Sequence, residues 1–483
     1  MPVLLAGVLI SSITYLDGSR LPASPYLAFG LVQLVAVATQ INRRNLLTAV
    51  FGLCLTLMLL MAADIELAPH LAYNGYLTSA VYTPRLIALA YSVLLCTSSV
   101  YHLLTLWFVP HRQWRWRSPD RIEQRLADRL RWVFLVGGTV MVVITVPGSP
   151  ITDAPYASAL SVQQAGMAAE ISGLSLLGIF LLSFAIVAAV RAKGYASLQF
   201  KLSTAYVIAL VAYFRLLRGD RGGSLGVFIT LAFVFYMSSK KPKWQKNLTM
   251  LLSAVLLFGF LQVWAAVRAE AHASGVWTSM ATNLSAAYPD LSHPLDIQLL
   301  PQSYWHLLHT IDLYTSGISL NGRTVPDLVL QSIPSFIADA FHYERPLNGA
   351  WLLASYRINS GGIYVIAEGF WNFGMVGALV VAVFLATLAI KLEAWYRNQH
   401  PVLASTYFAF LGTFGFGLFY GVQPLVKSLE VALVIAWFFK SVEKWYRRRA
   451  MSRLAMLVSR SRFIAANHQK LNPVRIVDHP CPN

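Results

Sequence analysis

Charged residues are scarce in this chain of 483 amino acids, since Asp, Glu, Lys and Arg together make up only 12% of it. A soluble domain of this length needs a far larger share of charge on its surface. Hydrophobic residues make up 57% of the chain, and the mean hydropathy is +0.56. This composition excludes a soluble globular protein and predicts an all-α, polytopic integral membrane protein.

Cysteine is also rare, with three residues at Cys54, Cys96 and Cys481. Two fall in predicted spans and the third in the C-terminal tail, which excludes an external disulfide framework and leaves the redox compartment undefined. A cleavable signal peptide is not evident either. The first apolar run, 3–16, has no basic leader and no convincing small-x-small cleavage site, so we expect it to stay as a span.

Acidic residues are too few to balance the basic ones, and the net charge is +17. Such an excess can indicate nucleic-acid binding, but here the basic residues lie in loops between apolar runs. They therefore report membrane topology, and we expect no nucleic-acid partner. At about 20 apolar residues per span, the chain offers twelve predicted helices. They are 2–16, 22–41, 46–64, 86–109, 132–148, 167–190, 200–216, 222–238, 247–267, 366–391, 402–423 and 427–442.

The distribution of Lys and Arg orients these spans. If the N-terminus is cytoplasmic, the cytoplasmic loops, the tail and Lys201 carry 28 of the 38 basic residues. Both termini are then predicted to be cytoplasmic. Two basic segments, 111–131 and the tail from 446, are interpreted as interfacial helices that rest on anionic headgroups of membrane lipids.

The predicted spans define four parts of the chain. Residues 1–267 hold about nine spans, 268–361 form one large external loop, 362–445 hold about three spans, and 446–483 form a basic tail. An external loop of this length is expected to fold as a small cap. Its many aromatic side chains suit either an amphipathic ligand such as a glycan or a membrane-interface belt.

One external turn, 215–224, runs against the charge bias because it holds Arg215, Arg218 and Arg221. Three arginines at this spacing, followed by Gly222, Gly223 and Ser224 before the next span, favour a site for phosphate or pyrophosphate. Alternatively, these arginines reach the headgroup layer, or one of them pairs with Asp220.

A second group of polar residues closes the external loop. Glu368 and Asn372 are four residues apart, hence on one helical face near the external end of a span. A carboxylate at that depth is a functional candidate by default. The alternative is that Glu368 neutralises Arg345 or Arg357 and only fastens the loop to the spans.

Other acid–base candidates have weaker patterns. The loop histidines His306, His309 and His342 rank after Glu368 as general bases, although His306 and His309 also fit an amphipathic helix face. We expect no metal site, because no third ligand has a recognisable spacing, and no cofactor. Asp64 and Glu66 lie in an early external loop and are interpreted as the end of a helix.

Together these motifs resemble the bacterial O-antigen polymerases of the Wzy type. The resemblance covers about residues 213–377 and the overall topology. It rests on the Arg-Gly-Asp-Arg-Gly turn, the large late external loop, Ile-Pro-Ser at 333–335 followed by Arg-Pro at 345–346, and the Glu-x-x-x-Asn-Phe-Gly-x-x-Gly run at 368–377.

The resemblance implies a GT-C-like membrane glycosyltransferase of the bacterial inner membrane, with its loop in the periplasm. Such enzymes join oligosaccharide repeat units carried on undecaprenyl pyrophosphate, which would serve as donor and acceptor. A chain-length regulator and a flippase are candidate further partners. On this basis we expect Glu368, Asn372 and His342 to act in catalysis. The residues expected to bind pyrophosphate are Arg215, Arg218, Arg221, Arg345 and Arg357.

Two other classes of function stay open. A ligase that transfers finished glycan from the same carrier to lipid A core shares the donor chemistry and differs in the acceptor. A secondary transporter is compatible with twelve spans, but such proteins usually show paired halves and charges at the midplane. The chain shows no internal repeat, and Glu430 is the one carboxylate near a midplane, three residues from Lys427.

Overall fold

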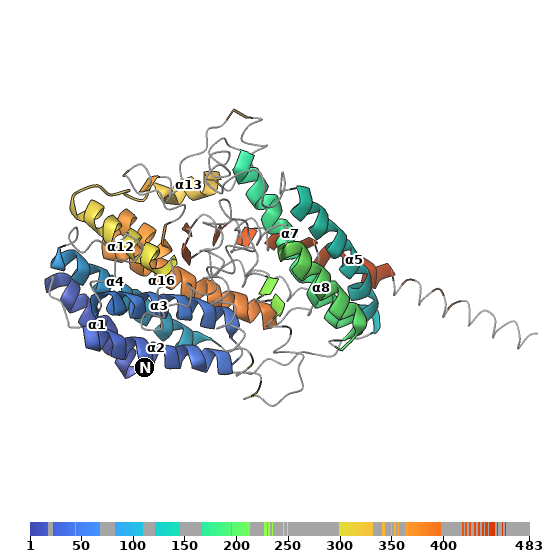
Figure 1. The fold of residues 1–483 in the computed structure, drawn as a ribbon, viewed down its shortest axis with the longest axis horizontal. Coiled ribbons are helices and arrows are strands. Elements are labelled where there is room, and N and C mark those ends of the chain that lie inside the picture. The colour runs from blue at the N-terminus through green and yellow to red at the C-terminus, as the bar shows by residue number, and fades with distance from the viewer. Residues whose placement is uncertain are drawn as a thin grey trace, which may run out of the picture.

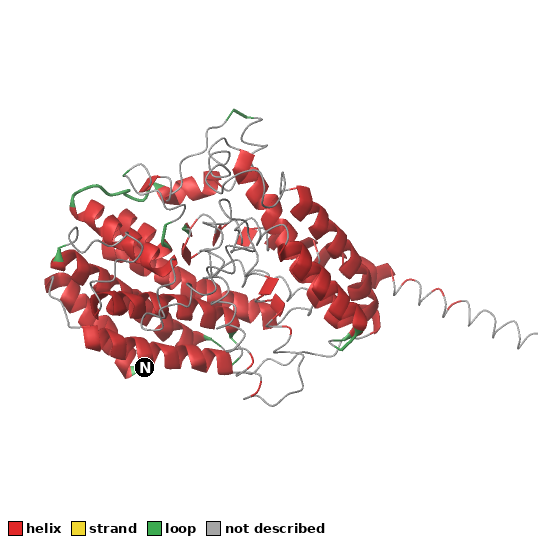
Figure 2. Ribbon diagram, viewed as in Figure 1, coloured by secondary structure: helices red, strands yellow, loops and turns green. Residues whose placement is uncertain are grey.

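The computed structural model describes most of the N-terminal half and two later stretches of the chain. The described ranges are 1–17, 23–43, 45–67, 83–109, 121–144, 167–194, 196–212, 299–331 and 363–397, with isolated residues between 227 and 249, 341 and 356, and 418 and 459. All regular secondary structure within these residues is helical (Figure 2). The predicted all-α class is thereby confirmed for the described part of the chain.

Figure 1 shows how the described helices are arranged. They are α1 (Pro2–Asp17), α2 (Ala23–Asn42), α3 (Leu46–Leu67), α4 (Pro84–Phe108), α5 (Arg121–Ile144), α7 (Met167–Lys193), α8 (Leu198–Val211), α12 (Leu299–Thr315), α13 (Thr324–Gln331) and α16 (Val365–Arg397).

Four of the described helices are long and apolar enough to cross a membrane. The spanning segments are Ser24–Asn42, Leu46–Ala63, Pro84–Phe108 and Val365–Trp395. Helices α1 and α8 are apolar but shorter, with 16 and 14 residues. The structure therefore has the helices of a membrane protein, whereas the predicted total of twelve spans extends over residues outside the described ranges.

Local sequence explains where several helices begin. Thr83 accepts a hydrogen bond from the amide of Leu86, and Pro84 occupies the first turn of α4. Ser197 caps α8 in the same way through the amide of Phe200. Pro301 and Pro326 lie in the first turns of α12 and α13, where a missing N–H costs nothing.

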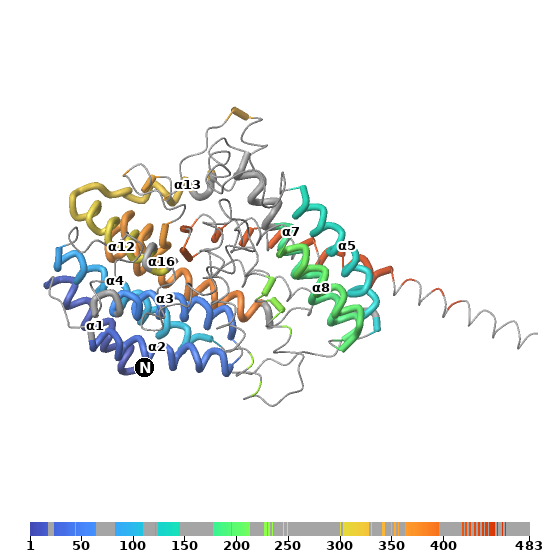
Figure 3. The backbone as a smooth tube through the Cα atoms, in the orientation of Figure 1, coloured from blue at the N-terminus to red at the C-terminus, as the bar shows by residue number. Residues whose placement is uncertain are grey.

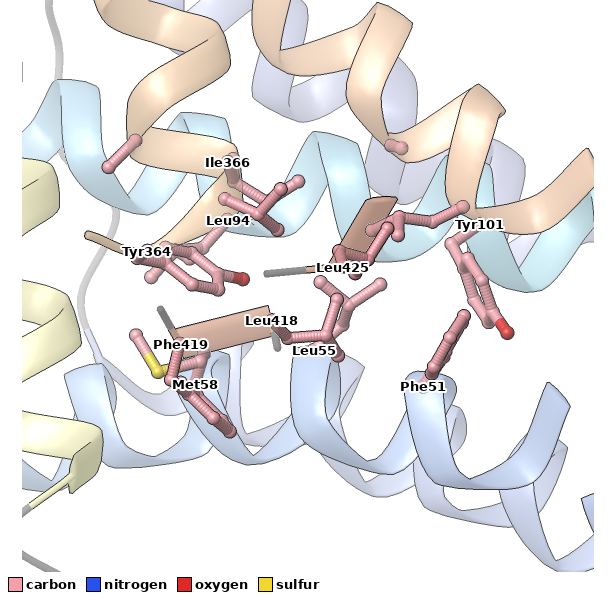
Figure 4. Close-up of a cluster of buried hydrophobic side chains, with 14 of the residues drawn as sticks. Phe51, Leu55, Met58, Leu94, Tyr101, Tyr364, Ile366, Leu418, Phe419 and Leu425 are labelled. Atoms are coloured by element: carbon pink, nitrogen blue, oxygen red, sulfur yellow. The ribbon is translucent and has the colours of Figure 1, made fainter. Parts of the chain in front are cut away.

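Helices α1 to α4, α12 and α16 lie together in the fold (Figure 3), and they share one hydrophobic core to which faces of α5 and α7 also contribute. Figure 4 shows its centre, where Leu55 of α3, Leu94 of α4 and Ile366 of α16 meet Leu418 and Leu425. Helix α12 contributes one apolar face to this core, made by Leu300, Tyr304, Leu307, Leu308 and Ile311. This helix of the external loop is therefore packed directly on the spanning helices α3, α4 and α16.

Helices α5, α7 and α8 form a second group with a second apolar core, in addition to the residues of α5 and α7 that belong to the first core. Helix α5 differs from the sequence prediction, which placed residues 111–131 in an interfacial helix and began a span at 132. The basic residues from Arg121 onward instead continue into the apolar part as one unbroken helix. Arg131 makes this continuation possible, because it is buried and hydrogen-bonds Gln199 of α8 at 3.1 Å.

Helix α16 bends sharply near its start. Phe373 and Gly374 have non-helical backbone angles, and Gly374 has a φ of +60°, which favours glycine. The bend brings Gly377 against Gly369, where a side chain on Gly377 would collide with the Gly369 carbonyl. The span predicted at 366–391 therefore consists of two helical segments that meet at a glycine-lined bend.

The other end of α16 holds α3 in place. Glu393 is fully buried, and its Oε1 accepts hydrogen bonds from the amides of Leu47 and Thr48, at 3.1 and 3.4 Å. These amides lie in the first turn of α3, where N–H groups have no partner within the helix and the helix dipole favours an anion. The two ends of α16 are thus tied to different neighbours.

Candidate functional site

The candidate site forms around Glu368, in the first turn of α16 before the bend. The side chain is buried, with 3% of its surface exposed. Its Oε2 accepts a hydrogen bond of 2.9 Å from the amide of Val422. Val422 is helical and follows the non-helical Gly421, so its N–H lies where a chain turns into a helix and favours a carboxylate.

Two glycines leave room for this carboxyl group. A Cβ on Gly421 would lie 3.0 Å from Glu368 Oε2, and a Cβ on Gly349 would lie 2.9 Å from Oε1. Gly421 also has a φ of +103°, a conformation that other residues adopt only with strain. The backbone around Glu368 is therefore shaped for a carboxyl group at this position.

The second oxygen of Glu368 has no donor among the described residues, and no described cation lies within 4 Å of the carboxylate. A buried carboxylate with one hydrogen bond is costly unless it has a further partner or a use. The proposed neutralising arginines, Arg345 and Arg357, lie outside the described residues.

Asn372 is joined to Glu368 as its spacing predicted. Its amide nitrogen donates to the Glu368 carbonyl and to the Thr324 hydroxyl, both at 2.8 Å. Because the Glu368 carbonyl can only accept, the side-chain nitrogen must point there. The Asn372 oxygen is therefore directed elsewhere, and it is buried without a hydrogen-bond partner in the described structure. Among the described residues, no donor reaches Glu368 Oε1 or Asn372 Oδ1.

The turn before α13 is hydrogen-bonded to the residues next to Asn372 and holds this part of α16 in position. Trp371 donates from its indole nitrogen to the Ile318 carbonyl at 2.9 Å, and its own carbonyl accepts from the Leu320 amide at 3.1 Å. These bonds attach the turn at 316–323 to α16, and Thr324 follows directly. Tyr314, at the end of α12, packs edge-on against Phe370 at 5.3 Å. The site is thus held by α12, α13 and α16 together.

His306 and His309 lie on α12 and are weaker candidates for the general base than Glu368. His306 is 1% exposed, and burial, with a smaller effect of His309, lowers its pKa to about 3. Burial also lowers the pKa of His309, partly offset by Asp312. Both rings pack against Trp305. A histidine with so low a pKa is a weak proton acceptor, which leaves Glu368 as the stronger candidate.

The other predicted site residues are not brought to Glu368 by the described structure. His342 is exposed in a turn with a positive φ of 51°, and no described contact joins it to Glu368 or Asn372. Asp64 and Glu66 are in the last turns of α3, as predicted for a helix end. The pyrophosphate candidates Arg215, Arg218, Arg221, Arg345 and Arg357 all lie outside the described residues, and so does Lys427.

Sequence reasoning missed Thr324, Gly349, Gly421 and Val422. Each contacts the Glu368–Asn372 pair through the fold, and none stands in a motif. The described residues hold no group of three His, Cys, Asp or Glu side chains arranged to bind a metal ion. Comparisons with protein families, with curated proteins and with solved structures find no match to this chain.

Proposed function

We propose that this protein is a membrane glycosyltransferase that polymerises oligosaccharide repeat units carried on undecaprenyl pyrophosphate, at the periplasmic face of the bacterial inner membrane. The observation that supports it most is Glu368. Its carboxylate is buried in the first turn of a helix long enough to span a membrane, one oxygen accepts a hydrogen bond from Val422, and no described residue donates to the other. A fixed orientation together with an oxygen that can accept a proton suits a general base.

In the proposed reaction, a hydroxyl of the acceptor sugar gives its proton to Glu368. The hydroxyl oxygen forms a bond to the anomeric carbon of the donor glycan, and the bond from that carbon to the pyrophosphate oxygen breaks. Undecaprenyl pyrophosphate leaves with the electron pair of the broken bond. Arg215, Arg218 and Arg221 are the residues proposed to stabilise its charge, with Arg345 and Arg357 as further candidates.

The Asn372 side-chain oxygen, which accepts no hydrogen bond from a described residue, supports a sugar as the substrate. The Asn372 oxygen would receive a neighbouring hydroxyl of the acceptor ring while Glu368 receives the reacting one. Sugars offer adjacent hydroxyl donors, whereas a simple cation transporter needs several oxygens around one ion. In the described structure, the hydrogen bond from Asn372 to the Glu368 carbonyl brings one carboxylate and one side-chain amide together.

A ligase acting on the same lipid carrier would use the same donor chemistry, so the experiment must separate the two reactions. In a strain that lacks the gene, we expect surface glycan of a single repeat unit, which wild type restores to a ladder of lengths. Polymer left on the lipid carrier would instead favour the ligase.

The variants then test the site. At matched membrane levels, Glu368→Gln and Arg221→Ala should collapse the ladder to one unit or none, and Arg221→Lys should do so if a fork-shaped phosphate contact is needed. Glu430→Gln, a matched carboxylate change elsewhere in the C-terminal part, should keep the ladder. A full ladder from Glu368→Gln rejects the carboxylate role, and no difference between deletion and wild type rejects the polymerase.

A further inference from the structure

Two basic segments that are more than 300 residues apart in sequence meet in the fold. The guanidinium of Arg129 in α5 lies over the ring of Tyr446, 5.5 Å from its centre. The N-terminal half of α5 and the helical residues 444–449 therefore lie side by side, and Figure 1 draws a red C-terminal segment next to α5. The sequence alone presents them as separate loops.

Part of this charge is used inside the protein. Arg131 is 4% exposed and pairs with Asp128 at 3.3 Å, and Lys193 of α7 approaches the same carboxylate at 3.8 Å. Seven other cations of these segments are exposed, and we call them the basic face: Arg121, Arg125 and Arg129 of α5 together with Lys440, Lys444, Arg448 and Arg449.

Both segments change from apolar to basic at this face. In α5, exposed Trp132, Val133 and Val136 follow directly after the arginines. In the C-terminal segment, exposed Trp437 and Phe438 come directly before Lys440. Exposed apolar residues beside exposed cations, on two adjacent segments, are typical of the boundary between the hydrocarbon and the headgroups of a bilayer.

Tryptophans mark this boundary on both segments. Trp132 and Trp445 are 58% and 56% exposed, and each ring has an arginine cation over it, Arg131 at 4.8 Å and Arg449 at 5.1 Å. Amphipathic tryptophan rings are enriched at the headgroup level. An acidic protein or a nucleic acid would satisfy the cations but would leave the adjoining apolar side chains in water.

We propose that the basic face is a composite binding surface for the phosphate groups of anionic phospholipids, with Trp132 and Trp445 at the level of the glycerol backbone. The basic face holds seven exposed cations, whereas the sequence of the same stretches, 121–131 and 440–449, contains three acids, Glu123, Asp128 and Glu443. The surface is independent of the glycosyltransferase proposal, because it lies on other helices than Glu368.

The test uses the purified full-length protein, titrated with phosphatidylglycerol or phosphatidylcholine and observed by native mass spectrometry. Wild type should bind phosphatidylglycerol preferentially. A cation near a membrane surface strengthens binding about fivefold, so Arg129→Gln/Arg449→Gln should weaken phosphatidylglycerol binding about twenty-five-fold. The matched control Arg85→Gln/Arg323→Gln removes two exposed cations elsewhere and should change binding less than threefold.

Equal binding of the two lipids by wild type would overturn the proposal, as would equal losses in both double variants. A preference for an acidic peptide such as polyglutamate over phosphatidylglycerol would also overturn it, in favour of a protein partner. Thermal unfolding in detergent, unchanged in Arg129→Gln/Arg449→Gln, separates lost binding from lost folding. Trp445→Leu should weaken phosphatidylglycerol binding without changing net charge, which a purely electrostatic attraction does not predict.

Discussion

At the residue scale, Gly421 determines where the Glu368 carboxylate lies. Its φ of +103° and the 3.0 Å from its Cβ position to Glu368 Oε2 leave no room for a side chain. We expect Gly421→Ala to lower stability by about 1–3 kcal/mol from strain and crowding and to displace the Val422 amide from Glu368. Thermal unfolding and the glycan ladder should both respond. Gly194→Ala is the control, since Gly194 has a positive φ of 84° but open space around its Cβ. Gly194→Ala should lower the melting temperature because of backbone strain, but it should leave the length of the glycan ladder unchanged.

His306 gives a prediction about pH. Its pKa is about 3 in the fold, against 6.5 for a free histidine, because burial disfavours the charged ring. Between these values the unfolded chain binds the proton and the folded chain does not, so stability falls as pH falls below 6.5, by up to about 1.4 kcal/mol per pH unit. His306→Gln should flatten the melting temperature between pH 6.5 and 5.5. An equal slope in wild type and variant would contradict this account.

Site residues that are close in sequence could be predicted, and those that are distant in sequence could not. Glu368 and Asn372 are four residues apart in one helix, so their shared face followed from helical geometry, and the bond from Asn372 to the Glu368 carbonyl confirms it. Thr324 and Val422 lie 48 and 54 residues from their partners. Contacts of that separation depend on tertiary packing, which leaves no local pattern in the chain.

At the scale of one element, the bend in α16 is the feature that presents Glu368 and Asn372 to the turn before α13. A Cβ on Gly377 would collide with the Gly369 carbonyl, so Gly377→Ala should open the bend and cost about 1–3 kcal/mol. Gly137→Ala in α5 is the matched control, because its Cβ would meet only Leu181 at 3.5 Å. It should be neutral or stabilising by up to about 1 kcal/mol. Melting temperatures in detergent check both, and equal shifts would show that the bend is unimportant.

The bend itself could not be predicted, although its glycines were part of the recognised motif. Glycine in an apolar run is compatible with a straight helix, a close helix contact or a left-handed residue. Only the packing of Tyr314 on Phe370, together with the attachment of 318–320 to Trp371, selects the bent form. The start of α5 was misjudged for a related reason. Four arginines in the first eleven residues of a helix predict an interfacial position from sequence. Only the structure shows that one of them, Arg131, is buried and hydrogen-bonds Gln199.

At the scale of the whole molecule, α16 should place its two buried glutamates on opposite sides of a membrane. Glu368 lies in its first turn and Glu393 near its last, with a spanning segment between them. The turn at 316–323 is then predicted to be external and the basic face cytoplasmic. Composition alone predicted the helical class and the four spans that the structure describes. The sequence assigned residues 268–361 to one loop and gave no sign that α12, within it, packs into the core against α3, α4 and α16.

Thiol labelling tests this orientation in a Cys481→Ser background. A membrane-impermeant reagent should label Ser316→Cys in intact spheroplasts, because that residue lies in the exposed turn beside the site. Ser452→Cys, exposed in the C-terminal segment, should react only after the membrane is opened. Labelling of both residues from the same side would contradict the topology. The unmodified Cys481→Ser background, in which Cys54 and Cys96 remain, gives the baseline.

The central claim is that Glu368 is the general base when a glycan is transferred between lipid carriers. The most direct measurement is made on purified protein in liposomes with lipid-linked repeat units. Wild type should convert single units into longer lipid-linked glycan. It should release one undecaprenyl pyrophosphate for each new glycosidic linkage. Glu368→Gln should lower the initial rate by about a hundredfold or more, as expected for a lost general base, with an unchanged melting temperature. A Glu368→Gln rate within threefold of wild type would contradict the account.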